Sequence, residues 1–153
     1  MQKTFEIDDI LGLIPAFEGM DGDPELAVAH RGNALSLLHQ TLGEGAWVGF
    51  YLPRERGLIL GAFQGTPACE VIAYGKGVVG ACYAEKATIA VSDVTAFPGY
   101  ICCDAAAKSE ICVPTYRDGE VIAVLDIDLP YVHDFSGEEE AFELLARALS
   151  SRI

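Results

Sequence analysis

The chain has 153 residues, of which 51% are hydrophobic and 22% charged, a composition that can fill one hydrophobic core. We therefore expect a single domain over residues 1–153. The net charge of −13 comes from 10 basic and 23 acidic side chains, so most of the surface should repel phosphate backbones and anionic lipid. This balance argues against nucleic acid and membrane surfaces as partners.

No targeting or membrane-spanning segment is evident in the sequence. The start, MQKTFEIDDI, lacks the basic region and long apolar run of a secretory signal. No apolar stretch approaches the roughly 20 residues that cross a bilayer. We therefore expect a cytoplasmic protein, in which cysteines stay reduced unless they are catalytic. The cysteines are odd in number: Cys69, Cys82, Cys102, Cys103 and Cys112.

Two helices and a hairpin are predicted in the first part of the chain. Residues 7–17 have the pattern of a short amphipathic helix. A second helix begins at Asp23, a good N-cap that is followed by Pro24. Strands at 47–52 and 58–63, joined by the polar PRERG turn, form a probable hairpin. The second helix has an apolar face made of a stripe and the leucines that widen it: Leu26, Ala29, Asn33, Leu37 and Gln40, with Leu35, Leu38 and Leu42.

The second part of the chain predicts another hairpin and a closing helix. Residues 65–109 are the least regular, with short apolar segments, a glycine-rich GKGVVG and a short helix near 81–85. Strands at 111–117 and 121–129 flank an Asp-Gly turn. A helix over 137–149 is capped by a serine with a glutamate three residues on. This order argues for an α+β domain, an antiparallel β-sheet with helices packed on one face.

Two carboxylates, Asp126 and Asp128, alternate along the last predicted strand and should share one face of the sheet. They would lie about 7 Å apart, close enough for repulsion to raise one pKa where water is scarce. Two solvated acids at an exposed strand end are the simpler alternative. Trp47 and Tyr51 share a face in the same way, and for them a core strand is the simpler interpretation.

The thiols fall into two groups. Cys112 lies in an apolar strand and Cys82 in a predicted helix, so both are most simply small core residues. Cys102 and Cys103 occupy a predicted loop beside Asp104, where adjacent side chains tend to point apart, so one should be buried and the other exposed. A thiolate near a carboxyl group that can donate a proton suits the reduction of an oxidised sulfur.

Two other kinds of site have weak support. No pair of cysteines has the spacing of zinc ligands, about two to four residues, and the three histidines are scattered. The GKGVVG segment has the glycines of a phosphate loop but lacks its strand-to-helix context and the following Lys-Ser/Thr.

A series of motifs runs in order from Trp47 to about Phe135: WVGFYL, LGAFQGTPAC, GKGVVG, DVTAFPGYICCD, SEICVP and LDID. In these motifs the chain resembles the free methionine-(R)-sulfoxide reductases, which have a GAF fold. The resemblance implies reduction of free L-methionine-(R)-sulfoxide to methionine by a cysteine thiolate, through sulfenic acid and disulfide intermediates. It also implies a homodimer, thioredoxin as the reductant, and no metal or organic cofactor.

The same resemblance gives the site residues their roles. Cys103 would be the catalytic cysteine and Cys69 its recycling partner. Trp47 and Tyr51 would wall the pocket around the substrate's methyl group. The acids that hold the substrate and its sulfoxide oxygen would be Glu110, Asp126 and Asp128.

Three positions depart from the family pattern. Val79 stands in GVVG where the family usually has a cysteine, Tyr100 replaces a common histidine, and Leu129 replaces a serine. Without a thiol at position 79, attack falls to Cys103. The resolving thiol is most simply Cys69, and the alternatives are Cys82 and Cys102.

The position of Glu110 depends on the hairpin turn. A strict two-residue turn at 118–119 would pair Glu110 with Ile127, on the face opposite the two aspartates. A shared site therefore requires a one-residue bulge or a three-residue loop, unless Glu110 precedes regular pairing. Which of the three carboxylates donates the proton stays open.

Two other functions remain open, because a fold does not decide a function. One is a non-catalytic GAF domain that binds a small molecule, and the other is a thiol protein that senses redox state through a partner. The chain ends soon after its closing helix, which favours a free-standing enzyme.

Overall fold

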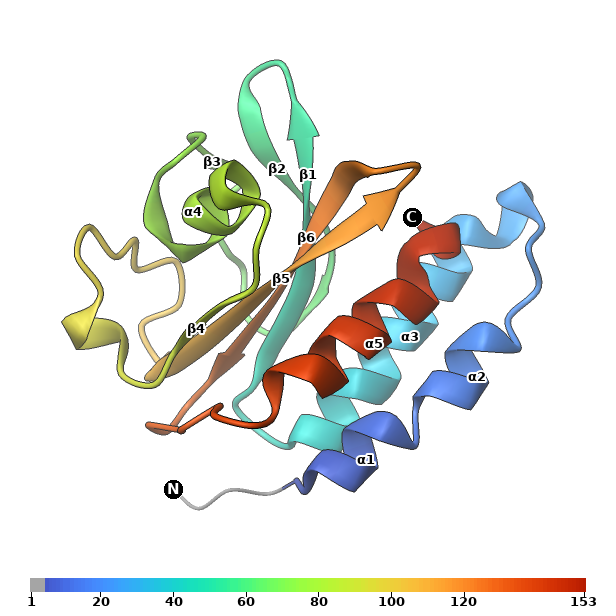
Figure 1. The fold of residues 1–153 in the computed structure, drawn as a ribbon, viewed down its shortest axis with the longest axis horizontal. Helices are drawn as coiled ribbons and strands as arrows, with labels where there is room; N and C mark the ends of the chain where they lie inside the picture. The colour runs from blue at the N-terminus through green and yellow to red at the C-terminus, as the bar shows by residue number, and fades with distance from the viewer. Residues whose placement is uncertain (1–4) are drawn as a thin grey trace.

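The computed structural model describes residues 5–153, and within them the chain forms a six-stranded antiparallel sheet in the order β3-β2-β1-β6-β5-β4 (Figure 1). The strands are β1 (Trp47–Arg54), β2 (Gly57–Gln64), β3 (Val71–Ile72), β4 (Ile89–Val91), β5 (Ser109–Arg117) and β6 (Glu120–Leu129). The α-helices are α1 (Ile7–Leu11), α2 (Ile14–Glu18), α3 (Ala27–Leu42), α4 (Gly77–Glu85) and α5 (Glu139–Leu149). Short 3₁₀ turns lie at Pro24–Leu26, Val94–Ala96 and Ser150–Arg152.

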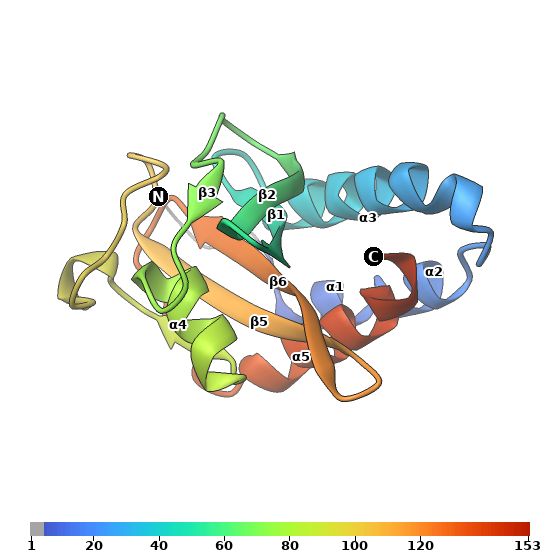
Figure 2. The ribbon, with the colours of Figure 1, turned by 90° about the horizontal axis from the view of Figure 1, so that it is seen from above.

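The sheet separates two unequal layers. Helices α1, α2, α3 and α5 lie on one side of it, and α4 lies on the other (Figures 1 and 2). The larger core is formed between the sheet and the first group of helices, and the smaller core between the sheet and α4. The α+β class and the antiparallel sheet are confirmed, and α4 is an addition on the face that the other helices leave open.

Strand alternation divides the side chains of β6 as predicted. Ala123, Leu125 and Ile127 belong to the larger core. Val124 belongs to the smaller core, and the neighbouring Asp126 is buried on the same face. The two aspartates of β6 therefore point to the side of the sheet that α4 covers.

The hairpin β5–β6 contains the predicted bulge. Asp118 and Gly119 form the turn with φ angles of 51° and 80°, which is the left-handed backbone that a two-residue hairpin turn requires. Arg117 pairs with Glu120 and Tyr116 with Val121, but Thr115 then pairs with Ala123, so Ile122 is the extra residue. The shift pairs Glu110 with Asp128 and Cys112 with Asp126.

The helical start of the chain differs from the prediction. The helix expected over residues 7–17 is two short helices, because Pro15 is at the start of α2 and cannot continue α1. Asp23 is an N-cap as predicted, since its side chain accepts a hydrogen bond from the backbone N–H of Glu25. It caps a 3₁₀ turn, after which α3 begins at Ala27.

The predicted apolar stripe of α3 was wrong. Leu26 and Leu37 are 41% and 39% exposed. Leu35, Leu38 and Leu42, which were expected only to widen that stripe, form the buried face together with Ala34, because this set contains no polar residue and packs against the sheet.

Two helix starts also differ from the sequence patterns. Helix α4 begins at Gly77, inside the glycine-rich segment, rather than near position 81. Helix α5 begins at Glu139, and Ser136 does not cap it. The backbone N–H of Ser136 instead donates to Asp134, 2.9 Å away, in a turn before the helix.

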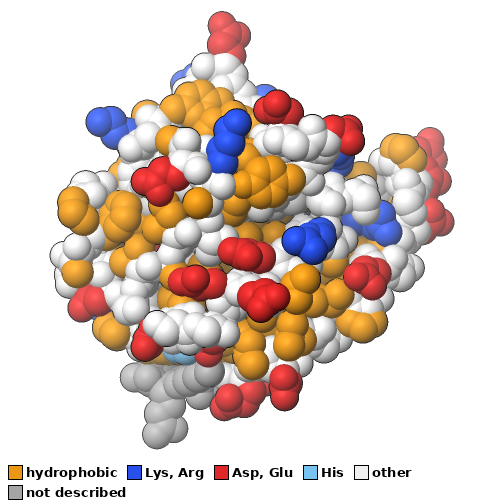
Figure 3. Space-filling model, viewed as in Figure 1, with side chains coloured by type: hydrophobic (Ala, Val, Ile, Leu, Met, Phe, Trp, Pro, Cys, Tyr) orange, Lys and Arg blue, Asp and Glu red, His pale blue; other side chains and the backbone are white. Residues whose placement is uncertain are grey.

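The described residues form a strongly acidic surface, and none of their helices is a candidate membrane span. Acidic side chains are scattered over the face drawn in Figure 3, with fewer basic ones among them. Among residues 5–153, no helix combines the length and the apolar character that a bilayer crossing would need.

We predict that Gly49→Ala destabilises the protein by about 1–3 kcal/mol. Gly49 lies in β1 opposite Asp126, and an added Cβ would come within 2.8 Å of the Cβ of Phe63 and would also meet the ring of Trp47. Urea unfolding measures the change. The control is Gly32→Ala in α3, where an added Cβ meets nothing within 4 Å and should stabilise the helix by up to about 1 kcal/mol. Equal stabilities of the two variants would contradict the close packing at Gly49.

Candidate active site

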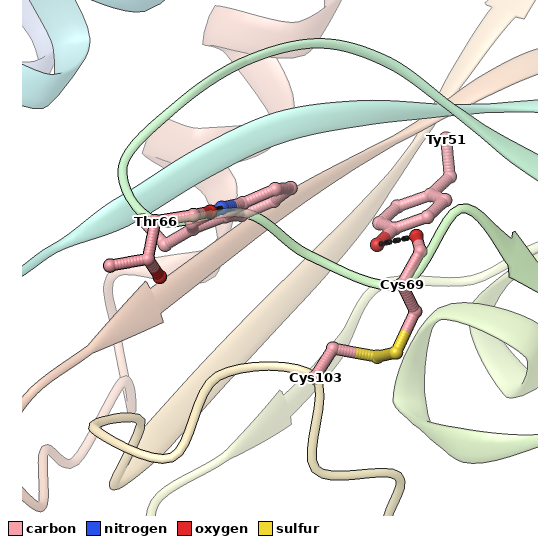
Figure 4. Close-up of a disulfide and its surroundings, with 5 residues drawn as sticks. Tyr51, Thr66, Cys69 and Cys103 are labelled. Atoms are coloured by element: carbon pink, nitrogen blue, oxygen red, sulfur yellow. Dashed lines mark hydrogen bonds between the residues drawn. A yellow bond between two sulfur atoms is a disulfide. The ribbon is translucent and has the colours of Figure 1, made fainter.

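A disulfide joins two loops on the side of the sheet that α4 covers. Cys69 precedes β3 and Cys103 precedes β5, and their Cα atoms are 5.3 Å apart across 34 residues of sequence (Figure 4). This is the pair that the family resemblance implies. Cys82 and Cys112 are buried, as predicted for core residues. Cys102 is exposed and Cys103 half-buried, so the adjacent cysteines differ in exposure as expected.

Two aromatic side chains of β1 hold the loop that carries Cys69. The indole N–H of Trp47 donates to the backbone oxygen of Thr66 at 2.8 Å, and the hydroxyl of Tyr51 donates to the backbone oxygen of Cys69 at 2.9 Å (Figure 4). The two rings stack on each other with centroids 6.2 Å apart. Burial and the nearby carboxylates raise the pKa of Tyr51, so its hydroxyl stays a donor.

Three carboxyl groups lie together beneath the disulfide. Glu110, Asp126 and Asp128 are only 5%, 4% and 7% exposed. Glu110 in β5 lies directly across from Asp128 in β6, so the bulge has brought it to the face of the two aspartates. The sequence-based expectation that the three acids share one face is confirmed.

Burial and mutual repulsion determine how readily each member of the acid cluster, Glu110, Asp126 and Asp128, ionises. Burial raises the pKa of Glu110 well above its usual range, and the charges of the two aspartates raise it further. Burial and the charge of Asp126 likewise raise the pKa of Asp128. Burial raises the pKa of Asp126 only to about 6, because hydrogen bonds from Glu110 and Cys112 favour its charged form. Asp126 is therefore the member that ionises most readily, while burial favours the protonated forms of Glu110 and Asp128.

A small cavity connects the disulfide to the acid cluster. Its volume is about 20 Å³, room for about one water molecule. Cys103 and the three carboxyl groups line it, and the rest of the wall comes from the segment around the start of α4 and from the Cys103 loop: Ile72, Lys76, Gly77, Val78, Val79, Tyr100 and Ile101.

The cavity wall differs from the one expected. Trp47 and Tyr51 share the sheet face and the smaller core with the cavity wall, but they do not line the cavity in this disulfide form. Sequence reasoning missed the apolar wall, although Val78 and Ile101 lie within the motifs that carry the resemblance. It also missed Cys112, whose place two residues after Glu110 on one strand puts both on the same face.

The cluster suits proton transfer better than metal binding. The donor atoms of Glu110, Cys112 and Asp126 lie within 4.8 Å of one another, all buried. Burial raises the pKa of the Cys112 thiol, so the sulfur keeps its proton, and a bound cation would have to displace it. No histidine lines the cavity.

A larger hollow lies elsewhere, between α5 and the far part of β5. Its volume is about 420 Å³, and its lining includes Lys86, Tyr116, Glu143 and Arg147. No cysteine lines it, so the chemistry of thiol and buried acid belongs to the smaller cavity.

Comparisons with known proteins identify the family of this chain. Residues 33–153 match the GAF domain family. The free methionine-R-sulfoxide reductase of Saccharomyces cerevisiae is 39% identical over 147 residues, which cover 90% of this chain and 82% of the yeast protein. That of Escherichia coli is 41% identical over 113 residues, 74% of this chain and 68% of its own.

A solved structure supports membership of the same family. The free methionine-R-sulfoxide reductase from Neisseria meningitidis, in complex with its substrate, matches with a TM-score of 0.84 and 35% identity, over 95% of this chain and 87% of that chain. The fold and the family match define a GAF domain. The chain belongs to the free methionine-R-sulfoxide reductases, a family of GAF-domain oxidoreductases.

We predict that Asp128→Asn stabilises the fold by about 1–3 kcal/mol at pH 7. The pKa of Asp128 is raised in the folded state. The aspartic acid therefore destabilises the folded protein at a pH where it would ionise in the unfolded chain. The gain should be absent below about pH 4, where the unfolded aspartic acid is protonated too, and should grow as the pH rises toward the raised pKa.

Denaturant unfolding at several pH values measures this gain. Glu44→Gln, at an exposed acid after α3, is the control and should change stability little at any pH. A gain for Asp128→Asn that does not vary with pH, or a loss at every pH, would show that Asp128 is not a buried protonated acid.

Proposed function

We propose that the protein reduces free L-methionine-(R)-sulfoxide to methionine, with Cys103 as the nucleophile. The observation that carries this proposal is that Cys103 lines the same small cavity as Glu110, Asp126 and Asp128. A sulfoxide reduction needs both a nucleophilic sulfur and a proton for the departing oxygen, and the cavity brings these two kinds of group together.

In the first step, the Cys103 thiolate attacks the sulfoxide sulfur while a protonated carboxyl group, Glu110 or Asp128, protonates the oxygen. The sulfur–oxygen bond breaks, and the oxygen passes to Cys103, which becomes a sulfenic acid. The substrate sulfur gains two electrons and the cysteine sulfur loses two. Methionine leaves, and the carboxylate regains its proton from solvent.

In the second step, the thiol of Cys69 attacks the sulfenic acid and releases water, which forms the Cys69–Cys103 disulfide. The Cys69–Cys103 disulfide of the structure supports this step, because it is the bond that the step would form. An external dithiol then reduces it, and we propose thioredoxin as that partner. Cys69 and Cys103 are both half-buried rather than fully buried, so an approach from solvent is open.

The charge state of the acid cluster supports a preference for the free amino acid. Asp126 is ionised at neutral pH and lies at the floor of the cavity, where it can bind a substrate ammonium group. A methionine sulfoxide within a peptide has no such group. We further propose, from the family resemblance, that the protein is a cytoplasmic homodimer.

The disulfide form cannot hold the substrate, since methionine sulfoxide is several times larger than the water-sized space at the site. Reduction must therefore enlarge the cavity by letting the Cys69 and Cys103 loops separate. Trp47 and Tyr51 anchor the Cys69 loop through hydrogen bonds to its backbone, so we assign the movement to the Cys103 loop. We propose that Trp47 and Tyr51, which belong to the smaller core on this face of the sheet, then wall the pocket around the substrate's methyl group.

We predict that Cys103→Ser abolishes reduction of free methionine-R-sulfoxide, because a hydroxyl cannot form the sulfenic acid and the disulfide. Cys69→Ser should release one equivalent of methionine per protein and then stop with thioredoxin as the reductant. Methionine release in single-turnover and steady-state assays distinguishes the two variants. Cys102→Ser, at the exposed neighbour, is the matched control and should keep most of the activity.

Near-normal turnover of Cys103→Ser would overturn the assignment of the nucleophile. Loss of the first equivalent in Cys69→Ser would move the nucleophile to Cys69. Mass spectrometry after one substrate equivalent should find the Cys69–Cys103 disulfide, whereas Cys82 or Cys102 in that bond would mean a different recycling route.

A further inference from the structure

A third thiol touches the acid cluster without lining the cavity. Cys112 is fully buried in β5 and lies directly across from Asp126. Its Sγ is 3.4 Å from Oδ1 of Asp126, within hydrogen-bond distance for sulfur. Burial and the surrounding carboxylates raise the pKa of Cys112, so the thiol keeps its proton and donates a hydrogen bond to the aspartate.

We propose that Cys112 is a positioning residue, whose S–H donor keeps Asp126 the ionised acid and thereby leaves the transferable proton on Glu110 or Asp128. This inference rests on the proposed reduction of a sulfoxide. It adds an explanation of why one of three similar acids is ionised while the other two can supply a proton. Cys112 acts only through Asp126 and takes no part in the redox steps.

The hydrogen bonds of the three acids support this division. Asp126 accepts a hydrogen bond from the thiol of Cys112 through Oδ1. Oδ1 of Asp128 is buried and has no hydrogen-bond partner within the described chain. A donor to a carboxylate favours its charged form, so the acid that Cys112 contacts ionises more readily than Asp128.

Hydrogen-bond donors rather than basic side chains determine whether Asp126 is ionised. The titratable groups around Asp126 come from every element packed against it, and among residues 5–153 only Lys76, an exposed residue on the cavity wall, is basic. The other groups are neutral donors or acids: Tyr51 of β1, Cys82 of α4, Tyr100 of the Cys103 loop, Glu110 and Cys112 of β5, and Asp128 of β6.

The chain offers a matched control in Cys82. This thiol is also fully buried in the smaller core, and burial raises its pKa to about 12. No hydrogen bond joins it to a carboxylate in the described structure. Cys82→Val and Cys112→Val therefore remove similar buried thiols, but only the second removes a donor to Asp126.

The first experiment does not depend on catalysis. Titration of the side-chain carboxyl ¹³C signals by NMR, with the Asp126 signal assigned through Asp126→Asn, measures its midpoint directly. We expect Cys112→Val to raise this midpoint by about half to one pH unit, Cys112→Ser to restore it, and Cys82→Val to leave it unchanged. An unchanged midpoint in Cys112→Val, or a wild-type Asp126 that titrates above both other acids, would overturn the proposal.

The second experiment measures single-turnover methionine release against pH. If ionised Asp126 binds the substrate, Cys112→Val should release methionine about two to five times more slowly than wild type at pH 6 and nearly normally at pH 8. Cys112→Ser should recover the wild-type profile. An equal loss at every pH, or the same shift in Cys82→Val, would leave Cys112 with a structural role only.

The two readouts separate this inference from the proposed function. If the wild type releases no methionine while the NMR midpoints shift as expected, the sulfoxide reductase proposal fails, and with it the catalytic use of the proton division. If methionine release is normal but the midpoints do not shift, the function stands and the role of Cys112 falls.

Discussion

The pairing of β5 with β6 is the constraint on which the rest of the site depends. The one extra residue at Ile122 changes which side chains lie opposite each other, and so places Glu110 beside Asp128 and Cys112 beside Asp126. Without it, the side-chain period of two would put Glu110 in the larger core, among leucines and phenylalanines that cannot satisfy a carboxyl group. The bulge thus creates the acid cluster, and the cluster's burial sets its protonation.

The second requirement is that a thiol reaches these acids. The acids lie on the sheet floor and the two cysteines lie on loops above it. Cys69 is more than 40 positions before Glu110, whereas Cys103 lies in the loop that leads into β5. Helix α4 closes the side of the cavity and excludes water, which strengthens every electrostatic effect on the carboxyl groups. The rigid sheet therefore fixes the proton donors, while the loops carry the sulfur atoms that must change partners during the proposed cycle.

Much of this arrangement could be predicted from local patterns. Alternation along β6 located the two aspartates, and the requirement that Glu110 join them predicted the bulge. The wall of the cavity could not be predicted, because Val78 and Ile101 meet the acids only through tertiary packing. Helix α4 was placed too late because glycines such as Gly77, with φ of 62°, resemble a loop in sequence. The hydrogen bond from Cys112 required the register, since an apolar strand gives no sign that its cysteine has a polar partner.

The central claim is that thiol and acid act on the same sulfoxide. A crystal structure of the reduced Cys103→Ser variant with free methionine-R-sulfoxide tests it most directly, since the variant can bind but not react. The account predicts the substrate sulfur about 3–3.5 Å from the hydroxyl oxygen of residue 103, and the sulfoxide oxygen within hydrogen-bond distance of Glu110 or Asp128. A substrate bound with its oxygen directed away from all three carboxyl groups would contradict it.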